Sequence, residues 1–587
     1  MSLRIRNLAD LDRIAAAGQA ALYPDRLKIL VGAASCGAAL GALEVEAAAI
    51  QSVEELGLEA AVARTGCIGL CSREPLVDLV LPHGPRVCYA DMTPAKTREL
   101  LSSYASGKGL RAETALGRFA AEEHVSTGEV HEYPRCAELE QVPEWSTLDF
   151  YRLQNKVILR NCGSIDPRAV EEAIARGAYH GAFRALTQMS PHDVIDEVTR
   201  SGLRGLGGAA FPTGRKWRLA RQAEGDVKFL VCNADEGEPG ACGDRSVLEG
   251  DPHAILEGMI LGAYAVGAER GFVYVRDEYP LALETFRHAV AEAERYGLLG
   301  DDLFGTGWSF RVEVRRGAGA YICGEETALL ESLEGRAGEP RNRPPYPVVE
   351  GLRGKPTVVN NVKTWAGVAP ILTRGADWYR TRGTKDSPGT TVFSLGGAVK
   401  NKGLVEVPFG TTLGQIVFEI GGGPAGDRPL KAIQAGGPAK GCLPASMLQA
   451  AGVAATPEGI GTGGIIVLDD RACMVDVTRF LTGFFAEQSC GKCTPCREGT
   501  RHMLRLLARI GQGAATPDDL TLLRRLARTV KSASLCGLGS MAPEPVLTAL
   551  RYFGEEFEMH VREKRCPAGA CRFENTRPAV EALVGDP

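Results

Sequence analysis

Three cysteines at short, regular intervals constrain this chain more than any other feature of its sequence. The segment SCGKCTPCREGT carries Cys490, Cys493 and Cys496, each two residues from the next, with glycine and proline between them. A tight loop of this kind turns successive thiolates towards one point. A fourth ligand has to come from elsewhere, and the glycine-rich segment SLCGLGS offers Cys536. Four thiolates also suit tetrahedral zinc, but closely spaced cysteines with a remote fourth are typical of a [4Fe-4S] cluster.

Two further sets of metal-ligand residues stand out among the 17 cysteines of the 587-residue chain. An odd number of cysteines and an N-terminus without a signal-peptide core make metal ligation or buried thiols a better explanation than disulfides. Near the N-terminus, Cys36 precedes the C-x3-C pair Cys67 and Cys71. The second set combines Cys473 with the C-terminal H-x5-C-x4-C pattern of His560, Cys566 and Cys571. One nitrogen and three sulfurs form a structural zinc set, and the alternative is a remnant linker with free thiols.

Composition narrows the class of protein. Hydrophobic residues make up 44%, charged residues 24%, and the net charge is −5, which is the profile of a globular protein and not of a nucleic-acid-binding one. No apolar stretch approaches the roughly 18 residues of a membrane helix, so we expect no membrane insertion and a cytoplasmic location. The 71 glycines among 587 residues make up a larger share of the chain than the usual value of about 7%. This excess suggests backbone that packs closely against a ligand.

The spacing of apolar residues predicts a multidomain α/β chain, and the length suggests about four domains. We expect a small α/β domain at 1–112, a polar linker at 113–149, a larger α/β sandwich at 150–382, a compact β-rich domain at 383–470, a helical bundle at 471–556 and a C-terminal tail at 557–587. The sandwich carries the glycine-rich loops, and the bundle carries the cysteine triplet.

Three loops of the sandwich have residues suited to a nucleotide. The segment RGLGGAAFPTGRKW at 204–217 approaches the G-x-G-x-x-G pattern without satisfying it. Its glycines allow backbone N–H groups to approach a phosphate, and Lys216 adds a positive charge. The segments NADEGEPG at 233–240 and GAGAYICGEETA at 317–328 follow strand-like runs. Their acidic groups can accept hydrogen bonds from ribose or ribityl hydroxyls or from a carboxamide, although isolated carboxylates are more often solvated.

These segments, followed in order by KPTVVNNVKTW and SCGKCTPCREGT, resemble the NADH-binding flavoprotein subunit of respiratory complex I. The same subunit type occurs in NAD-reducing hydrogenases, electron-bifurcating hydrogenases and NAD-dependent formate dehydrogenases. The resemblance covers about residues 150–555. It implies FMN, NAD(H) and [4Fe-4S] as cofactors. It further implies a Rossmann-like FMN and NADH sandwich, a β-grasp-like domain that binds a soluble ligand, and a helical bundle around the cluster.

The resemblance also assigns residues to the site. It implies that FMN phosphate is held by Gly205, Gly207, Gly208 and Lys216, and the flavin by Asn233, Asp235, Glu236, Glu238, Asn360 and Asn361. It also implies a flavin and nicotinamide pocket lined by Tyr321, Gly324, Glu325 and Glu326, with the adenine between Phe211 and Tyr346. Glu326 is the expected catalytic carboxylate near the nicotinamide, in a positioning role. The expected [4Fe-4S] ligands are Cys490, Cys493, Cys496 and Cys536.

Three positions depart from the family pattern. Leu206 replaces a usual arginine, Ala210 replaces a further glycine, and Leu219 stands at the place of an adenine-stacking aromatic residue. These changes bear on nucleotide affinity and on the choice between NADH and NADPH. They also motivate an alternative hypothesis, in which the chain is a flavin-less docking scaffold that carries a cluster and zinc.

The N-terminal segment resembles the thioredoxin-like [2Fe-2S] ferredoxin domain that is fused to some of these subunits. That family has C-x4-C followed by C-x3-C, and Cys36, Cys67 and Cys71 match three of the four ligands. The first position is Val31. Either another group takes the place of the missing thiolate, or the domain docks without a cluster.

Together these resemblances predict a flavoprotein subunit that transfers hydride between NAD(H) and FMN and single electrons between FMN and iron–sulfur clusters. The fused N-terminal domain and a CPAG segment favour a soluble hydrogenase-type complex, with electron bifurcation left open. A complex I module and a formate dehydrogenase module are the alternatives. The expected partners are a thioredoxin-like [2Fe-2S] subunit and a larger iron–sulfur or catalytic redox subunit.

Overall fold

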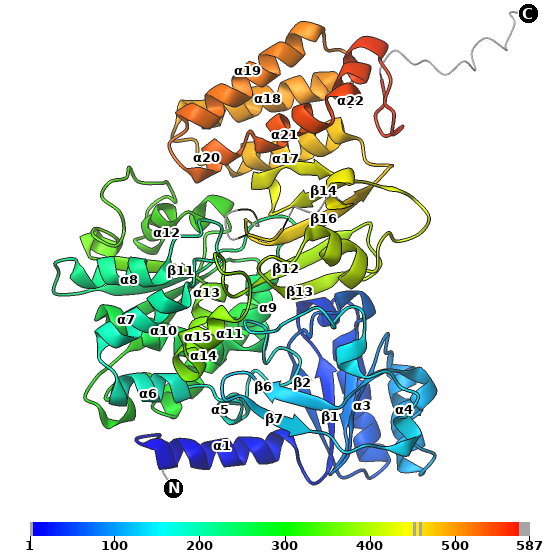
Figure 1. Cartoon of the computed structure of the whole chain (residues 1–587), viewed down its shortest axis with the longest axis vertical. Coiled ribbons are helices and arrows are strands. Elements are labelled where there is room, and N and C mark those ends of the chain that lie inside the picture. The colour runs from blue at the N-terminus through cyan, green and yellow to red at the C-terminus, as the bar shows by residue number, and fades with distance from the viewer. Residues whose placement is uncertain (1–3, 450–453, 457–458, 460, 574–587) are drawn as a thin grey trace, which may run out of the picture.

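The computed structural model describes residues 4–449, 454–456, 459 and 461–573. Within these residues the strands form sheets of five, four and five strands and one two-stranded hairpin. Figure 1 shows the chain rising from an N-terminal α/β region through a central α/β region and a β-rich region to helices at the C-terminal end. The protein is therefore a multidomain α/β chain with a helical C-terminal region, as the sequence predicts.

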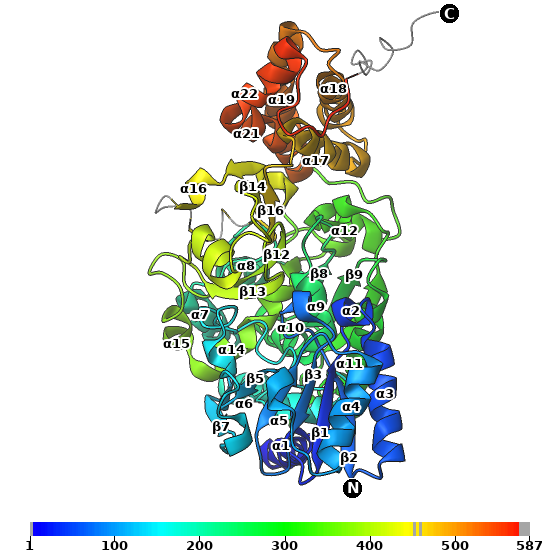
Figure 2. The same ribbon diagram turned by 90° about the vertical axis from the view of Figure 1, so that its right-hand side faces the viewer.

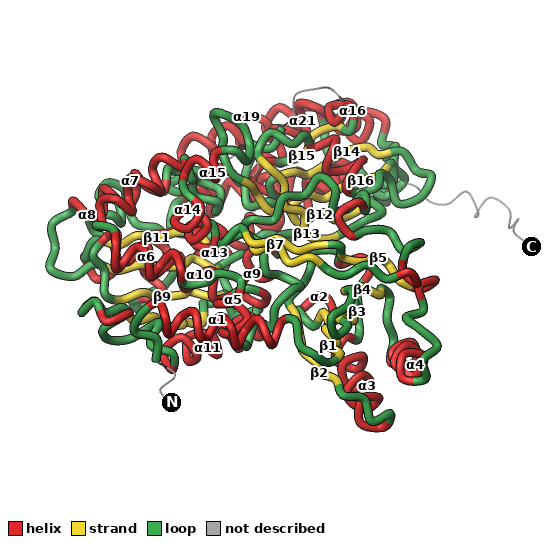
Figure 3. The backbone as a smooth tube through the Cα atoms, turned by 60° about the horizontal axis from the view of Figure 1, so that its bottom comes forward, coloured by secondary structure: helices red, strands yellow, loops and turns green. Residues whose placement is uncertain are grey.

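The N-terminal sheet has the strand order β2-β1-β3-β4-β5. Only β1 and β2 are parallel; the other neighbours are antiparallel. The strands are β1 (Leu27–Gly32), β2 (Ala60–Thr65), β3 (Val77–Val80), β4 (Arg86–Tyr89) and β5 (Ala115–Phe119). Helices α3 (Ala42–Glu55) and α4 (Pro94–Ala105) pack against one another beside this sheet, and Figure 3 shows the unit projecting from the rest of the molecule.

The first helix packs outside the domain that its position in the sequence suggests. Helix α1 (Leu8–Leu22) begins after Asn7, whose side chain accepts a hydrogen bond from the N–H of Asp10. It packs against α5 (Val170–Ala175), and a Cβ added at Gly18 would stand 1.9 Å from the carbonyl oxygen of Glu171. This close approach requires glycine. The segment therefore shares a core with the central region.

The expected linker at 113–149 contains regular structure, which corrects the sequence prediction. Strand β5 completes the N-terminal sheet, and β6 (Ala121–His124) pairs with β7 (Glu129–Glu132) in the hairpin. Glu122 of this hairpin pairs with the fully buried Arg86, which also pairs with Asp78. The acidic composition that indicates a linker thus reflects both exposed strand residues and one buried ion-pair partner.

The central sheet is entirely parallel, with the order β10-β9-β8-β11. It comprises β8 (Phe229–Ala234), β9 (Arg270–Val275), β10 (Arg311–Arg316) and β11 (Thr357–Asn361), and it is flanked by α8 (Thr213–Gln222), α10 (Pro252–Val266) and α11 (Pro280–Arg295). Between β8 and β9 the chain moves to one side of the sheet, whereas β11 pairs on the other side of β8. Ligands of parallel sheets bind beyond the carboxyl ends of the strands at such a reversal of strand order.

The second five-stranded sheet has the order β13-β12-β16-β14-β15 and leads into the helices. Its strands are β12 (Thr390–Gly397), β13 (Gly403–Pro408), β14 (Leu430–Ala435), β15 (Cys442–Pro444) and β16 (Gly464–Asp469). The helices are α17 (Met474–Gln488), α18 (Thr494–Gly511), α19 (Pro517–Ala533), α20 (Gly537–Met541), α21 (Glu544–Tyr552) and α22 (Gly554–Glu558). Figure 2 shows these helices stacked on the end of the molecule opposite the N-terminal sheet. None of the helices in the described ranges is long and apolar enough to span a bilayer.

Candidate functional site

The carboxyl ends of β8 and β11 bring two asparagines side by side. Asn233 and Asn361 are register partners in the parallel ladder. The Asn233 amide donates to the carbonyl of Gly324 at 2.8 Å, and the Asn361 amide donates to Asp244 at 2.5 Å. The neighbouring Asn360 accepts from the indole of Trp217 at 3.4 Å. These contacts join three of the sequence segments assigned to the flavin.

The first glycine loop lies over the end of β11. The N–H of Gly205 donates to the carbonyl of Phe211 at 2.9 Å, and this closes the loop on itself. Gly208 has a φ of +101°, which favours glycine, and a Cβ at Gly207 would stand 3.0 Å from the Cβ of Asn361. The glycines of this loop therefore allow its backbone to lie close to the end of β11.

The amine of Lys216 on α8 lies between β11 and the start of α12 (Glu326–Leu333), among the residues of the glycine loop, the acidic loop and the paired asparagines that we call the nucleotide crevice. Its Nζ lies 3.0 Å from the carbonyl oxygen of Val359 and 3.3 Å from Oε2 of Glu326. The other oxygen of Glu326 lies 3.3 Å from Arg343, so this carboxylate is held between two cations. Glu326 is the first residue of α12. Glu325 instead caps that helix and accepts from the N–H groups of Thr327 and Ala328, a role that the sequence prediction missed.

The acidic residues of the second loop are buried. Glu236 accepts from the backbone N–H groups of Asp244 and Arg245, and Glu238 accepts from the hydroxyl of Tyr321 at 3.0 Å. Oδ2 of Asp235 is buried and has no hydrogen-bond partner among the described residues. Burial raises the pKa of Asp235 to about 7. An orphaned buried acceptor of this kind suits a ligand that donates a hydrogen bond, such as a flavin or a hydroxylated chain.

Lys363 is a buried residue of this crevice that the sequence prediction did not include. It follows the paired asparagines in VVNNVKTW, and its Nζ lies 3.0 Å from Asp244 and 3.9 Å from Glu236. The same amine donates to the carbonyl of Thr462 in the β-rich region at 3.2 Å. The sequence signal that could have identified it is a lysine among apolar residues directly after a predicted strand. It compensates the charge that the buried carboxylates concentrate here.

The residues assigned to the adenine lie at the surface. Phe211 is 37% exposed and Tyr346 is 54% exposed. Arg215 lies over the ring of Phe211 and Arg343 over that of Tyr346, at 5.7 Å and 5.9 Å from the ring centroids. Leu219 is similarly exposed. Both rings are therefore accessible to a stacking ligand.

The four cysteines of the triplet and its remote partner line one cavity. Its walls are Ile322, Pro340, Ser489, Cys490, Lys492, Cys493, Cys496, Leu535, Cys536 and Leu538. A single tetrahedral metal ion would hold sulfurs about 3.8 Å apart, given metal–sulfur bonds of about 2.3 Å. In the described part of the chain, the N-terminal and C-terminal sets each bring at least three ligand atoms within 4.8 Å of one another, whereas no three of the four cysteines in this cavity do so. The wider arrangement around this cavity favours a cluster with its own volume, as in [4Fe-4S].

One short turn forms a wall of both the crevice and the cysteine cavity. This turn is η6 (Tyr321–Gly324). Ile322 faces the cysteines, whereas the Tyr321 hydroxyl donates to Glu238 and the Gly324 carbonyl accepts from Asn233. The backbone N–H of Tyr321 donates to Gln488 at the end of α17. A ligand in the crevice would therefore lie close to a cluster in the cavity.

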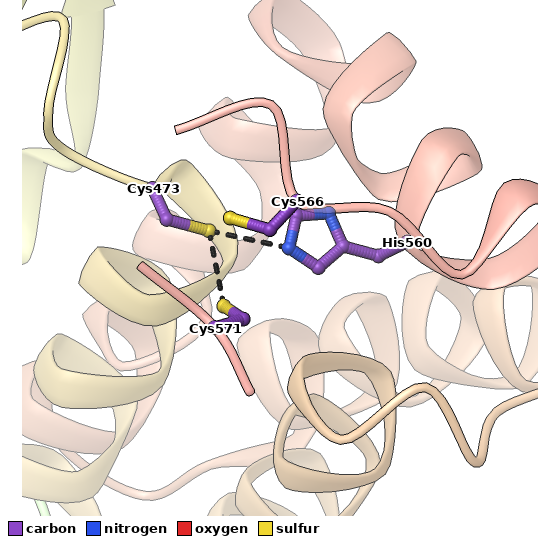
Figure 4. A group of neighbouring side chains, drawn as sticks. All are labelled: Cys473, His560, Cys566 and Cys571. Carbon is purple, nitrogen blue, oxygen red and sulfur yellow. Dashed lines mark hydrogen bonds between the residues drawn. The ribbon is translucent and has the colours of Figure 1, made fainter. Parts of the chain in front are cut away.

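The four residues of the C-terminal set converge on one point. Figure 4 shows Cys473, His560, Cys566 and Cys571 pointing towards one another, and their ligand atoms all lie within 4.8 Å. The Cys473 sulfur lies 3.4 Å from Nε2 of His560 and 3.5 Å from the sulfur of Cys571. The hydrogen bonds from Cys571 and His560 lower the pKa of Cys473 to about 4. His560 Nδ1 bonds to the carbonyl of Glu556, an orientation typical of histidine ligands.

The N-terminal set converges as well. The sulfurs of Cys36, Cys67 and Cys71 lie within 4.8 Å of one another, and those of Cys67 and Cys71 are 3.5 Å apart. Val31, at the place of the fourth expected cysteine, is buried in β1. The three thiols are therefore suited to hold a metal centre, with a fourth ligand required from another residue.

Two family models match this chain. The Nuo51 FMN-binding domain matches residues 198–370, and the NADH-ubiquinone oxidoreductase-F iron-sulfur binding region matches residues 476–560. The first range contains the glycine loops, and the second contains the cysteine triplet with Cys536. Both ranges lie almost entirely within residues 150–555, which carry the resemblance in sequence.

Curated relatives agree with these matches. The chain is 47% identical to the NADP-reducing hydrogenase subunit HndC of Solidesulfovibrio fructosivorans, over 71% of this chain and 86% of that protein. It is 43% identical to an NADH-quinone oxidoreductase subunit of Rhizobium meliloti, over 70% of this chain and 99% of that protein. It is 40% identical to the corresponding NADH-quinone oxidoreductase subunit of Escherichia coli, over 68% and 91%.

Among solved structures, a chain of the NAD⁺-reducing [NiFe]-hydrogenase in the H₂-reduced state aligns with 94% of this chain and 87% of its own length. The TM-score is 0.63 at 30% identity. The alignment therefore extends over nearly the whole chain, beyond the part shared with the curated relatives. The chain belongs to the family of FMN-binding, [4Fe-4S]-containing flavoprotein subunits that is found in the NADH-quinone oxidoreductases and in hydrogenases that reduce NAD⁺ or NADP⁺.

Proposed function

We propose that this chain oxidises NADH at FMN and passes the electrons to a [4Fe-4S] cluster within a multisubunit redox complex. The observation that carries the proposal is the shared wall at η6, which separates the nucleotide crevice from the cysteine cavity by one turn of backbone. FMN supplies the step between two-electron hydride transfer and one-electron transfer, and the protein supplies its binding, orientation and electrostatic surroundings.

The residues of the crevice have separable tasks in this proposal. The N–H groups of the glycine loop and the amine of Lys216 bind the FMN phosphate, because both offer donors to an anion. Oδ2 of Asp235 accepts a hydrogen bond from the flavin, which resolves its unpaired state. Glu326, fixed between Lys216 and Arg343, positions the nicotinamide. Phe211 and Tyr346 stack on the adenine.

The metal ligands are also assigned by this proposal. Cys490, Cys493, Cys496 and Cys536 hold the [4Fe-4S] cluster, supported by the cavity that they line. Cys473, His560, Cys566 and Cys571 hold a structural zinc ion, supported by their convergence and by the hydrogen bond that orients His560. Such ligands require reduced thiols, which supports a cytoplasmic location.

We also propose a domain type for each of the three larger sheets. We assign the N-terminal sheet to a thioredoxin-like domain, the central sheet to a Rossmann-like FMN and NADH domain, and the second five-stranded sheet to a β-grasp-like domain. The parallel central sheet with its reversal of strand order and the mixed order of the β-rich sheet support the last two assignments.

The parent complex is proposed to be of the soluble hydrogenase type. Support comes from the printed names of HndC and of the NAD⁺-reducing hydrogenase, whose chain aligns with 94% of this one. Partners would be a thioredoxin-like [2Fe-2S] subunit and a larger iron–sulfur or catalytic subunit. Mass spectrometry of proteins that copurify with the tagged full chain tests this assignment. Recovery of a hydrogenase catalytic subunit is expected, and recovery of a formate dehydrogenase or complex I partner instead would contradict it.

The proposed function is tested with anaerobically purified full chain and its Cys536→Ser variant, with Cys136→Ser as a control outside the three ligand sets. Wild type and control should contain FMN, and NADH should bleach the flavin absorbance. The Cys536→Ser variant should keep the flavin and its bleaching but lose about four iron atoms per chain. A wild-type chain without FMN and without NADH-dependent bleaching would instead support the docking-scaffold hypothesis.

A further inference from the structure

A buried carboxylate faces the N-terminal cysteines. Glu74 follows the turn η1 (Cys71–Arg73), and its side chain carries one oxygen 3.9 Å from the sulfur of Cys36. The other oxygen accepts from the N–H of Leu76 at 2.9 Å. Glu74 is only 6% exposed, so its carboxylate has been removed from water together with the thiols.

No cation compensates this carboxylate in the part of the chain that the structure describes. The nearby Asp78 is paired with the buried Arg86, but no ion pair within 4.0 Å involves Glu74. Buried carboxylates in proteins are ordinarily paired with a cation or bound to a metal. The group that faces Glu74 is instead the thiol of Cys36, one of the three candidate metal ligands.

The ligand count leaves one place for Glu74. A single tetrahedral iron or zinc ion takes four ligands, and a [2Fe-2S] cluster also takes four ligands from the protein. Cys36, Cys67 and Cys71 supply three. Val31, where the thioredoxin-like ferredoxin pattern has its first cysteine, has an apolar side chain in the core and cannot supply the fourth. An all-thiolate cluster therefore does not fit these residues.

Three of the four groups converge closely, because the sulfurs of Cys36, Cys67 and Cys71 lie within 4.8 Å of one another. The sulfurs of Cys67 and Cys71 are 3.5 Å apart, and Cys36 lies 3.9 Å from the oxygen of Glu74. Two ligands on one tetrahedral metal are expected about 3.8 Å apart when both are sulfurs. The Cys67 and Cys71 sulfurs are thus close to the separation that one metal atom requires, and Glu74 adjoins the set beside Cys36. Iron in [2Fe-2S] centres also accepts ligands other than thiolate, as the histidine-ligated Rieske type shows.

We propose that Glu74 replaces the missing cysteine as the fourth ligand of an N-terminal [2Fe-2S] cluster, beside Cys36, Cys67 and Cys71. The fourth ligand then comes from the turn next to Cys71 instead of the strand that carries Val31. Carboxylate oxygen is an ordinary ligand for iron in proteins.

The surroundings hold the Cys36 loop in place for this role. The N–H and hydroxyl of Ser35 both donate to Glu249 of α9 (Gly243–Gly250), at 2.9 Å and 2.6 Å. Gly66 lies against Gly250 of the same helix, where an added Cβ would stand 2.3 Å from its Cα. Both oxygens of Glu249 thus accept hydrogen bonds from Ser35. Glu249 is therefore a suitable control for Glu74, because it is a carboxylate close to the site that is not proposed as a ligand.

The test uses the full chain purified anaerobically, with iron, acid-labile sulfide and zinc measured per chain and low-temperature EPR after dithionite reduction. Wild type should contain about six iron atoms, four in one cluster and two in the other. Cys67→Ala and Glu74→Ala should each retain about four and lose the same EPR signal. Glu74→Cys should keep about six iron atoms with altered g-values, because it restores four thiolates. FMN content and the [4Fe-4S] signal serve as folding controls.

Glu249→Gln should keep the full iron content, because its carboxylate is not a ligand. The proposal is overturned if Glu74→Ala keeps all the iron with unchanged g-values. It is equally overturned if wild type carries zinc at this site, or if its iron content equals that of Cys67→Ala. None of these outcomes depends on NADH oxidation, so the proposed function can fail while Glu74 remains a ligand, and the reverse also holds.

Discussion

At the residue scale, Ala210 stands out because its backbone adopts a conformation that favours glycine. Its φ is +52° and its side chain is buried. This is also the position at which the family resemblance implies a further glycine. A non-glycine residue in the left-handed region costs roughly 1 kcal/mol. The chain therefore tolerates a small local strain in the loop that is proposed to hold FMN phosphate.

We expect Ala210→Gly to stabilise the folded chain by roughly 0.5–1 kcal/mol, because glycine removes the left-handed penalty but gains freedom when unfolded. The thermal midpoint should rise by roughly 2 °C. Ala209→Gly is the matched control, since Ala209 is exposed and has no positive φ. An unchanged or lower midpoint for Ala210→Gly would argue against strain at this position.

The amine of Lys216 is the charge that the proposed phosphate site depends on. Replacing it with methionine should weaken FMN retention by roughly 10- to 100-fold, because a hydrogen bond to a charged group contributes roughly 1.5–3 kcal/mol. Arg218→Met, on the same helix but half-buried and paired with Asp196, should leave retention unchanged. The measurement is fluorescence of FMN released on dilution; equal retention in both variants would remove Lys216 from the site.

Asp235 makes the stability of the flavin-free chain depend on pH. Burial raises its pKa from 3.8 to about 7, so the folded state favours the protonated carboxyl. This contribution is present below the unfolded pKa and is lost as the pH rises towards about 7. It amounts to at most roughly 4 kcal/mol, at 1.4 kcal/mol per pKa unit.

Asp235→Asn should therefore flatten the decline in thermal midpoint of flavin-free protein between about pH 4 and pH 7. The exposed Asp386→Asn is the control and should retain the wild-type slope. Parallel curves for wild type and Asp235→Asn would show that the carboxyl is ionised throughout.

At the scale of elements, the parts of the fold that follow from local patterns could be predicted, and the parts that depend on docking could not. The apolar runs KFLVCNA, GFVYVRD and FRVEVRR are the adjacent strands β8, β9 and β10. The convergence of Cys473 with His560, 87 positions apart, was predicted from ligand chemistry. The docking of α1 on α5 has no local signal, because its amphipathic pattern does not identify its partner. Hairpin β6–β7 was missed because exposed strand residues resemble a linker.

The C-terminal helices depend on the proposed zinc set, because it ties the start of α17 to the segment after α22. His560→Ala should lose about one zinc per chain and lower the thermal midpoint of the helical region, since removing a ligand weakens a four-ligand site. His502→Ala, on the exposed face of α18, should change neither. The measurements are the zinc content per chain and thermal unfolding followed by the helix signal in circular dichroism. A zinc-free His560→Ala variant with the wild-type thermal midpoint would show that the set does not stabilise these helices.

At the scale of the whole molecule, the N-terminal cysteine loop is held between two other regions. Gly66 lies against α9 of the central region, and the N–H of Leu404 in β13 donates to the carbonyl of Gly69 at 2.8 Å. The amine of Lys156 donates to the carbonyl of Ile68 at 2.6 Å. Contacts from both sides fix the N-terminal domain relative to the flavin crevice.

Gly66→Ala should loosen this docking, because its Cβ would stand 2.3 Å from the backbone of Gly250. We expect faster limited proteolysis that releases the N-terminal domain, with destabilisation of roughly 1–3 kcal/mol from overpacking. Gly511→Ala, where nothing lies within 4 Å of the added Cβ, is the control. If both variants are digested at the wild-type rate, the contact with α9 does not hold the domain.

The central claim is that one turn of backbone places the flavin and the [4Fe-4S] cluster in electronic contact. Anaerobic titration of the full chain with NADH, followed by flavin absorbance and low-temperature EPR of the same samples, tests it most directly. We expect flavin bleaching together with the signal of a reduced cluster in wild type, and bleaching without that signal in Cys536→Ser. Flavin that bleaches in wild type while the cluster on Cys490, Cys493, Cys496 and Cys536 stays oxidised at every NADH concentration would contradict the claim.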